Sequence, residues 1–444
     1  MPLRCTRIFA AICALLPVVH VQAQQPTPAT ASATGVISRT DRDRALAILD
    51  VVSKDIHDRY YDPKMHGLDW NAVTANARNK IAESNSLNEA LTQIAIAVGT
   101  LNDSHTRFFP PTHPYHLDFG LEYQMFWDRC LVTHVRPGSD AEAKGLKPGT
   151  ELLRINGTPP KRQNLSDIEY LDEILNPRPD MQLEAKTLSG EMQKIEVHAK
   201  ISTSGDYFYR PGAGVRYDVI RHSENVIHRM RMQLEQRDDI AILKFPWFFF
   251  DADDFYWLGG KIRKDKAMIV DLRGCPGGSV QTLKYFVGMF FDHDVKIFDK
   301  VDRKKTSSEI VKSEKHNSFP GKLVVLVDSR SASGAEIFAR VMQLEKRGTV
   351  IGDRTSGRVM ESIGLWTASS GIDYGMNITV ANPIMSDGKS LEHVGVVPDQ
   401  MALPTQEALA FGSDPVLANA AQALGAKITP EEAGKLFPYE WPKD

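Results

Sequence analysis

The chain has 444 residues, of which 42% are apolar and 25% are charged, so it has the composition of a soluble globular protein with room for two or three domains. Lys and Arg number 53 against 56 for Asp and Glu, which gives a formal net charge of −3. No basic block is present that could follow a nucleic-acid backbone. Composition therefore excludes a wholly disordered chain and argues against nucleic acid as a partner.

The first 23 residues have the pattern of a secretory signal peptide. Two arginines precede an apolar run from Ile8 to Val19, and the triplet Val21–Ala23 has small residues where a signal peptidase reads. The alternative is an uncleaved membrane anchor, but the run is too short to span a bilayer and Pro17 interrupts it. We expect cleavage near Ala23, export to the periplasm or the medium, and no membrane span in the mature chain.

Four cysteines are present, and two of them, Cys5 and Cys13, lie in the signal segment. The other two, Cys130 and Cys275, are too few for a disulfide-rich scaffold. Because they fall in different predicted domains, we expect free thiols.

Helical spacing of apolar residues runs from about Thr40 to Leu101. It predicts three helices, and Ser86 with Glu89 has the spacing of a capping box at the start of the third. The predicted helices cover residues 43–61, 70–84 and 86–101. The third ends in the loop 102–111, NDSHTRFFPP, which carries Ser104 and His105.

Short alternating apolar runs replace the helical pattern between about Phe119 and Ile201, and such runs are typical of strands. From about Asp239 to Leu424, strands and helices alternate, which indicates an α/β layer structure. The aromatic run FPWFFFDADDFYW, residues 245–257, is interpreted as a buried strand and its packing helix. The alternative is that part of it lines a cleft for apolar side chains.

Two glycine-containing corners suggest chemistry. Gly277 and Gly278 follow a predicted buried strand, where the absence of Cβ lets backbone N–H groups approach a ligand oxygen. Ser333 begins a predicted helix, and the next N–H, from Gly334, faces the same space. The corners together predict an oxyanion hole beside a hydroxyl. The alternatives are two tight turns and a serine that is only an N-cap.

Six motifs occur in a fixed order: NDSHTRF, the strand-rich insert with PGSDAEAKGLKPGTELLRINGTP, DLRGCPGG, LVDSRSASGAEI, IGDRTSGR and LEHVGVVPD. This order resembles the C-terminal-processing, or tail-specific, serine peptidases over residues 40 to 425. The resemblance implies an α/β protein whose catalytic core is crotonase-like (ClpP/crotonase-type), with an N-terminal helical region and an inserted PDZ-like β-rich domain.

The resemblance also implies a division of the chain. The predicted parts are a signal peptide (1–23), a linker (24–39), an N-terminal helical region with the Ser-His loop (40–118), a PDZ-like domain (119–202), a connector (203–238), an α/β catalytic core (239–425) and a C-terminal tail (426–444). Gly120 and Leu121 match the start of a peptide-carboxylate loop and are predicted to bind substrate. Glu122 stands where the PDZ family usually has glycine, which argues against simple capture of a chain end.

One departure affects the mechanism. The processing peptidases activate the serine with a lysine, and Arg358 stands at the matching position in TSGR. Arginine stays protonated and cannot be the base. Arg358 is interpreted either as a structural ion pair, which we favour, or as a cation that meets a substrate carboxylate.

The tricorn-core branch of the family offers a different base. There a Ser-His pair and a late glutamate replace the lysine, and Ser104, His105 and Glu392 match these parts. His105, with an ordinary pKa of about 6.5, would accept the Ser333 proton. Glu392 would orient the imidazole through Ser104. The alternatives are a packing histidine and a solvated turn.

Other patterns are weaker. Ser386 to Lys389 matches S-x-x-K without its companion motifs. His113 and His116 lack further ligands at zinc spacing. We therefore expect an exported serine endopeptidase acting on protein or peptide substrates, with no metal and no organic cofactor, and its oligomeric state is left open. The rival functions are a ligand- or peptide-binding protein on the same fold and an acyl-hydrolase acting on other esters or amides.

Overall fold

The computed structural model describes residues 37–111, 113, 115–203, 230–313 and 318–441. The predicted signal peptide, almost all of the linker and most of the connector lie outside these residues. None of the described helices is long and apolar enough to cross a membrane. Cys130 and Cys275 are free and buried, which confirms the expectation for these two thiols.

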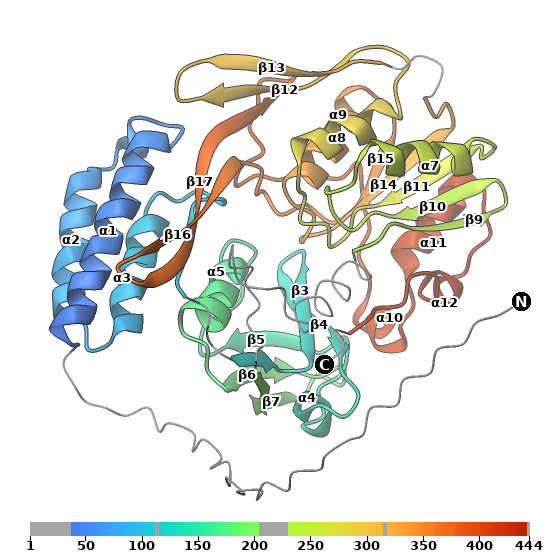
Figure 1. The fold of residues 1–444 in the computed structure, drawn as a ribbon. Coiled ribbons are helices and arrows are strands. Elements are labelled where there is room, and N and C mark those ends of the chain that lie inside the picture. Colours follow the sequence, from blue (N-terminus) through green and yellow to red (C-terminus); the bar gives the residue numbers. More distant parts are fainter. Residues whose placement is uncertain (1–36, 112, 114, 204–229, 314–317, 442–444) are drawn as a thin grey trace, which may run out of the picture. The chain divides into compact units, whose positions relative to one another are not determined.

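Three N-terminal helices pack on one another, and the first of them lies against a long β-hairpin (Figure 1). Each helix begins at a side chain that accepts an N–H, and for the third this is Ser86, which accepts from the Glu89 amide at 3.1 Å. The Glu89 carboxylate accepts from Asn85 instead of Ser86, so only half of the predicted capping box forms. The helices are α1 (Arg39–Arg59), α2 (Trp70–Glu83) and α3 (Leu87–Gly99), with a 3-10 turn, η1 (Met65–Gly67), after α1.

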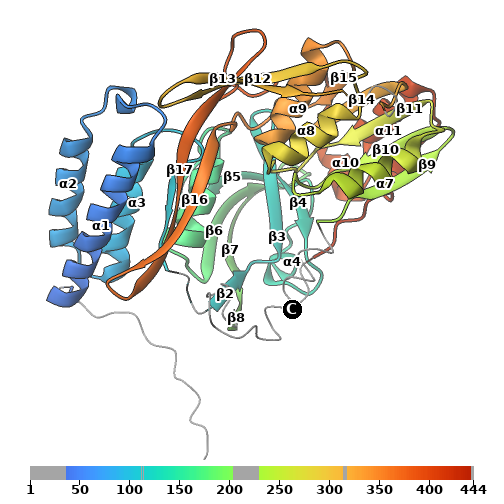
Figure 2. The same cartoon turned by 45° about the horizontal axis from the view of Figure 1, so that its top comes forward.

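The hairpin belongs to a five-stranded antiparallel sheet of order β1-β17-β12-β13, with β16 beside β17 (Figure 2). Arg107 of β1 pairs with Asn377 of β17, which fixes the loop carrying Ser104 and His105 just before β1. The strands are β1 (Arg107–Phe109), β12 (Val295–Asp302), β13 (Thr306–Val311), β16 (Glu361–Ser369) and β17 (Ile372–Met385). The pattern of the sequence did not indicate β12, β13 or β16.

A second antiparallel sheet, of order β3-β4-β5-β6-β7, forms the β3–β7 region with its own apolar core. β3 is an edge strand of this sheet. Its strands are β3 (Leu121–Phe126), β4 (Arg129–Val135), β5 (Glu151–Ile155), β6 (Asp180–Lys186) and β7 (Met192–His198). The neighbouring elements are α4 (Asp140–Ala143), α5 (Leu165–Tyr170), the π-helical turn η2 (Leu171–Leu175), and the pair β2 (Tyr115–Asp118) and β8 (Lys200–Thr203).

The third sheet has the order β18-β15-β14-β11-β10-β9, and only β9 runs antiparallel to its neighbour. Alternate residues of β14 face two different cores: Val325 lies in the core with α8 and α9, and Leu326 in the core with α11. Both faces are therefore covered, as expected for parallel strands. The strands are β9 (Gln233–Arg237), β10 (Ile240–Lys244), β11 (Ala267–Asp271), β14 (Lys322–Val327), β15 (Thr349–Gly352) and β18 (Gln400–Met401). The helices are α7 (Ala252–Ile262), α8 (Val280–Gly288), α9 (Gly334–Leu344), α10 (Gln406–Phe411), α11 (Pro415–Leu424) and α12 (Pro430–Ala433).

The aromatic run 245–257 corrects one expectation. The strand β10 ends at Lys244, so residues 245–251 do not form the predicted strand, whereas the predicted helix, α7, begins within the run at Ala252. Phe245 and Phe248 are fully buried, whereas Phe249 and Tyr256 are each 60% exposed. Phe245 and Phe248 therefore pack in the core beside the sheet, whereas Phe249 and Tyr256 lie at the surface.

Candidate active site

Ser333 lies at the corner between β14 and α9, in a backbone conformation that non-glycine residues rarely adopt (φ 54°, ψ −117°). Its N–H donates to the carbonyl of Arg358 at 2.7 Å and to the Glu336 carboxylate at 3.0 Å. Such conformations persist only where the surroundings over-determine them, and they cluster at functional sites. The hydrogen bonds that the Ser333 N–H donates to Arg358 and Glu336 supply that support here.

The two predicted glycine corners meet at this serine. A Cβ placed on Gly277, whose φ is +90°, would lie 2.6 Å from the Ser333 Cβ and 2.7 Å from the Gly334 nitrogen. The Ala332 N–H also donates to the Cys275 carbonyl at 2.9 Å, which ties the corners together. Glycine at 277 is therefore required by a close backbone approach to the serine and by its dihedral angle.

Two backbone N–H groups remain for a ligand oxygen. In the described parts of the chain, neither Gly334, the first residue of α9, nor Gly278 donates to a backbone carbonyl. Burial raises the pKa of the Cys275 thiol to about 12, and the N–H of Gly277 acts in the opposite direction by hydrogen bonding to that thiol. Gly277 therefore supplies room for the corner, while Gly334 and Gly278 are the better donors.

The loop carrying His105 is held by Asp103. One oxygen of its carboxylate accepts the N–H of His105 at 2.9 Å, the N–H of Thr106 at 2.7 Å and the hydroxyl of Thr379 at 2.6 Å. Thr379 belongs to β17, so this carboxylate anchors the loop to the long hairpin.

Ser104, His105 and Glu392 form one hydrogen-bonded chain. The Ser104 hydroxyl donates to Glu392 Oε2 at 3.0 Å and lies 2.7 Å from His105 Nδ1. Because its proton goes to the carboxylate, this hydroxyl accepts from Nδ1–H. The second imidazole nitrogen, Nε2, is then the unprotonated one, as a general base requires.

Glu392 is itself held from two sides. Its Oε1 accepts the Ser104 N–H at 2.8 Å, and its Oε2 accepts the Val359 N–H at 3.0 Å as well as the Ser104 hydroxyl. The carboxylate thus connects the 102–106 loop to the loop after β15. Its position is set by backbone groups, which makes it a fixed anchor for the histidine.

Burial, and to a smaller extent the Arg358 cation, lower the pKa of His105 from 6.5 to about 4. The imidazole is consequently neutral at neutral pH. A neutral ring can accept a proton, whereas a cationic one cannot.

Arg358 bridges the histidine loop and the serine corner. Its guanidinium donates to the Ser104 carbonyl at 3.1 Å, and its own carbonyl accepts the Ser333 N–H. Within 4.0 Å it has no ion-pair partner among the described acidic residues, and the interpretation as a structural ion pair therefore stays a prediction. Its side chain is held by a backbone carbonyl instead.

The predicted residues are not all in direct contact. Ser104, His105 and Glu392 are joined by hydrogen bonds, and Arg358 links them to Ser333. Across the described chain, no hydrogen bond joins His105 to Ser333. The proton transfer between these two residues therefore stays a prediction.

Glu336 is a site residue that sequence reasoning missed. It is fully buried and accepts the N–H groups of Ser333, Gly357 and Arg358 and the hydroxyl of Thr355, at 2.5 to 3.0 Å. Burial raises the pKa of this carboxyl to about 7, against these donated bonds. The Ser333–Glu336 spacing, S-x-x-E, is a capping-box signal that places Glu336 at the start of a helix, but it does not predict the burial of the carboxylate.

Gly120 and Leu121 lie at the start of β3, outside the serine-histidine cluster. β3 nevertheless contacts the turn that precedes Ser333, because Arg330 donates to the Tyr123 carbonyl at 2.6 Å and the Ser329 hydroxyl donates to the Met125 carbonyl. Arg330 also pairs with Glu169 of α5 at 2.7 Å. The edge of β3 is thus covered by the nucleophile turn.

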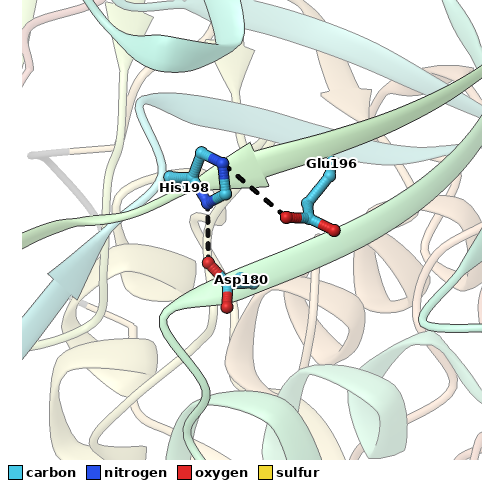
Figure 3. Close-up of side chains that lie close together, drawn as sticks. All are labelled: Asp180, Glu196 and His198. Carbon is cyan, nitrogen blue, oxygen red and sulfur yellow. Dashed lines mark hydrogen bonds and ion pairs between the residues drawn. The ribbon is translucent and has the colours of Figure 1, made fainter.

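One cluster has the composition of a metal site, and it lies in the β3–β7 region (Figure 3). His198 Nδ1 lies 2.6 Å from Asp180, and Nε2 lies 3.7 Å from Glu196. The hydrogen bond to Asp180 raises the pKa of His198, which favours the cationic form of the ring beside the two carboxylates. Exposure of all three residues and this charge balance describe a surface ion-pair cluster.

Comparisons with known proteins agree on one family. Residues 239–402 match the model of Peptidase family S41, and residues 44–89 match the Tricorn protease C1 domain. The carboxy-terminal processing protease CtpA of Bacillus subtilis is 26% identical over 280 residues, which cover 61% of this chain and 53% of that protein. A tail-specific protease of Haemophilus influenzae is 26% identical over 251 residues, covering 54% of this chain and 33% of that protein. The chain thus spans about half or less of these two relatives.

Solved structures show the same fold. Mature CPAF complexed with lactacystin superposes with a TM-score of 0.62 at 14% identity, covering 84% of this chain and 96% of that one. The photosystem II D1 C-terminal processing protease gives a TM-score of 0.52 at 16% identity, covering 87% and 99%. The chain therefore has a mixed α/β fold of this type, with N-terminal helices and a β-rich region.

Proposed function

We propose, from the match of residues 239–402 to Peptidase family S41 and from the similarity to processing proteases, that the chain is an exported serine endopeptidase of the C-terminal-processing type, acting through a Ser/His/Glu relay. We further propose that the six-stranded sheet of order β18-β15-β14-β11-β10-β9 belongs to a crotonase-like core and that the β3–β7 region is PDZ-like. Support for the relay comes from the tricorn-type match at residues 44–89 and from arginine in place of the usual lysine.

In the proposed mechanism, the Ser333 hydroxyl attacks the carbonyl carbon of the scissile peptide bond. His105 Nε2 takes the hydroxyl proton and later returns it to the leaving amine. The N–H groups of Gly334 and Gly278 stabilise the oxyanion of the tetrahedral intermediate. A water molecule then hydrolyses the acyl-enzyme with His105 again as the base, which frees Ser333.

The observation that carries this proposal is the Ser104 hydroxyl between His105 and Glu392. A structural histidine needs only a partner for one nitrogen. Here the partner is itself oriented by a carboxylate, so Nδ1 must be the protonated nitrogen and Nε2 the acceptor.

Hydrolysis of a fluorogenic peptide library tests the proposal. We expect Ser333→Ala and His105→Ala each to lower kcat/KM by about 10³-fold or more, while Arg358→Lys does not restore activity to the His105→Ala chain. Matched ester substrates run in parallel separate a peptidase from an acyl-hydrolase. Full activity of Ser333→Ala, or hydrolysis of esters alone, would reject the proposal.

A further inference from the structure

A short segment near residue 440 contacts the β3–β7 region through its side chains. Leu436 and Phe437 pack against the core beside α11, and the chain then continues to Tyr439 and Trp441. The Tyr439 hydroxyl donates to Glu122 at 3.0 Å, its ring stacks on His134 with centroids 4.0 Å apart, and the Arg136 guanidinium lies 4.7 Å from the centre of the Trp441 ring.

The three receiving residues form one surface, the β3–β4 face, defined by Glu122, His134 and Arg136. Glu122 and His134 are cross-strand partners in β3 and β4. Arg136 follows His134 by two residues, so the strand period of two directs both side chains to the same side. Each offers a different chemistry: a carboxylate for a hydroxyl, a flat ring for stacking, and a cation for an aromatic face.

The segment of residues 439–441 is suited to replacement by a second peptide. Tyr439 retains 41% of its surface exposed to solvent, and Pro438 and Glu440 are exposed as well. The segment belongs to no helix or strand in the described chain. Its side-chain contacts are of a kind that a second peptide with the same residues would make equally well.

We propose that the β3–β4 face is a binding site for peptide segments of the form Tyr-x-Trp, and that residues 439–441 are its resident occupant in cis. A free peptide must displace this occupant, whose attachment to the same chain gives it a high effective concentration. The proposal concerns binding, and it does not rest on the proposed peptidase activity.

The test uses a labelled peptide with the sequence of residues 435–441, KLFPYEW, blocked at both ends, and reads fluorescence anisotropy. The Ser333→Ala chain serves as the background so that no peptide is consumed. We expect the peptide to bind the Tyr439→Ala/Trp441→Ala variant at least tenfold more tightly than the parent, because the cis competitor has lost its contacts. The matched peptide KLFPAEA should bind neither.

The surface is tested in the same variant. Adding His134→Ala should abolish peptide binding, whereas Arg129→Ala, which removes an ion pair with Glu151 elsewhere in the region, should leave it unchanged. Equal affinity for parent and variant, or binding that survives His134→Ala, would overturn the proposal.

A second measurement needs no substitution in the segment. In the unsubstituted full chain, excess KLFPYEW should accelerate chymotrypsin cleavage after Tyr439, and KLFPAEA should not. Cleavage that is unaffected by either peptide would show that the segment is a permanent part of the structure.

Discussion

His105 is surrounded so that its charged form is disfavoured. Burial is the larger cause and the Arg358 cation the second, and they bring its pKa to about 4 from 6.5. If this ring is the base, kcat/KM stays nearly constant from pH 8 down to about pH 5.5. A base with the ordinary pKa would lose about tenfold over this range. Stopped assays of a fluorogenic peptide between pH 5 and 8 measure this acidic limb of the dependence of kcat/KM on pH.

Substitution at Arg358 tests whether its positive charge contributes to the lowered pKa of His105. Arg358→Gln keeps a donor for the Ser104 carbonyl but removes the cation, so the acidic limb should move to higher pH. Stability must be followed beside activity, because the unfolded chain binds more protons than the folded one between pH 6.5 and 4, and stability therefore falls as pH drops through that window. Circular dichroism at each pH identifies unfolding. A limb already near pH 6.5 in the unsubstituted chain would contradict the assignment.

Sequence motifs identify some of the site residues but not all of them. Family resemblance pointed to Ser104, His105 and Glu392, because each stands in a motif of fixed order. It did not point to Glu336, since a glutamate one turn into a helix has the appearance of a surface residue. Burial of that carboxylate follows from the packing of the 355–358 loop over the start of α9, which no local pattern contains.

At the scale of elements, the corner after β11 matters because it approaches the start of α9. Gly277→Ala would place a Cβ 2.6 Å from the Ser333 Cβ, so the serine or the corner must move. We expect kcat to fall by about 100-fold or more, comparable to the loss of an oxyanion donor.

Gly274 is the matched control for this substitution. It has a similar positive φ, +75° against +90°, but a Cβ there would meet nothing within 4 Å. Gly274→Ala should therefore lower the free energy of unfolding by about 1–3 kcal/mol through backbone strain, and Gly277→Ala by at least that amount, because it adds the close contact with Ser333. Only Gly277→Ala should lower kcat. Thermal melts measure the stability of both variants, and steady-state kinetics measure their kcat. Equal losses of kcat would show that the close approach of Gly277 to Ser333 is not the cause of the loss.

The apolar patterns of the sequence predicted some helices and strands better than others. The N-terminal helices and the strands β10, β11, β14 and β15 have strong apolar signals because one stripe or both faces are buried. β13 and β16 have mostly exposed or half-exposed side chains, so the apolar alternation that marks a strand is weak. Their place in the sheet comes from pairing with β12 and β17.

On the scale of the whole molecule, the β3–β7 region is coupled to the nucleophile turn through Arg330. We expect Arg330→Ala to lower kcat on short peptides by about tenfold, because the turn before Ser333 loses its hydrogen bond to β3 and its ion pair with α5. Arg129→Ala, in the same region but without contact to the turn, is the control. Steady-state kinetics with short and long substrates provide the measurement.

The outcome separates two roles for this region. If it only docks long substrates, Arg330→Ala leaves the hydrolysis of short peptides unchanged, and removal of residues 119–201 impairs long substrates more than short ones. If it also holds the nucleophile turn in place, short substrates suffer as well. The structure favours the second role, because the edge of β3 is occupied by the turn itself.

Site-resolved labelling with a fluorophosphonate tests the central assignment most directly. We expect a single adduct on the Ser333 hydroxyl, mapped by mass spectrometry, that forms at least about 100-fold more slowly in the His105→Ala chain. The absence of an adduct at Ser333, or equal labelling rates in the two chains, would contradict it and would favour a binding protein on this fold.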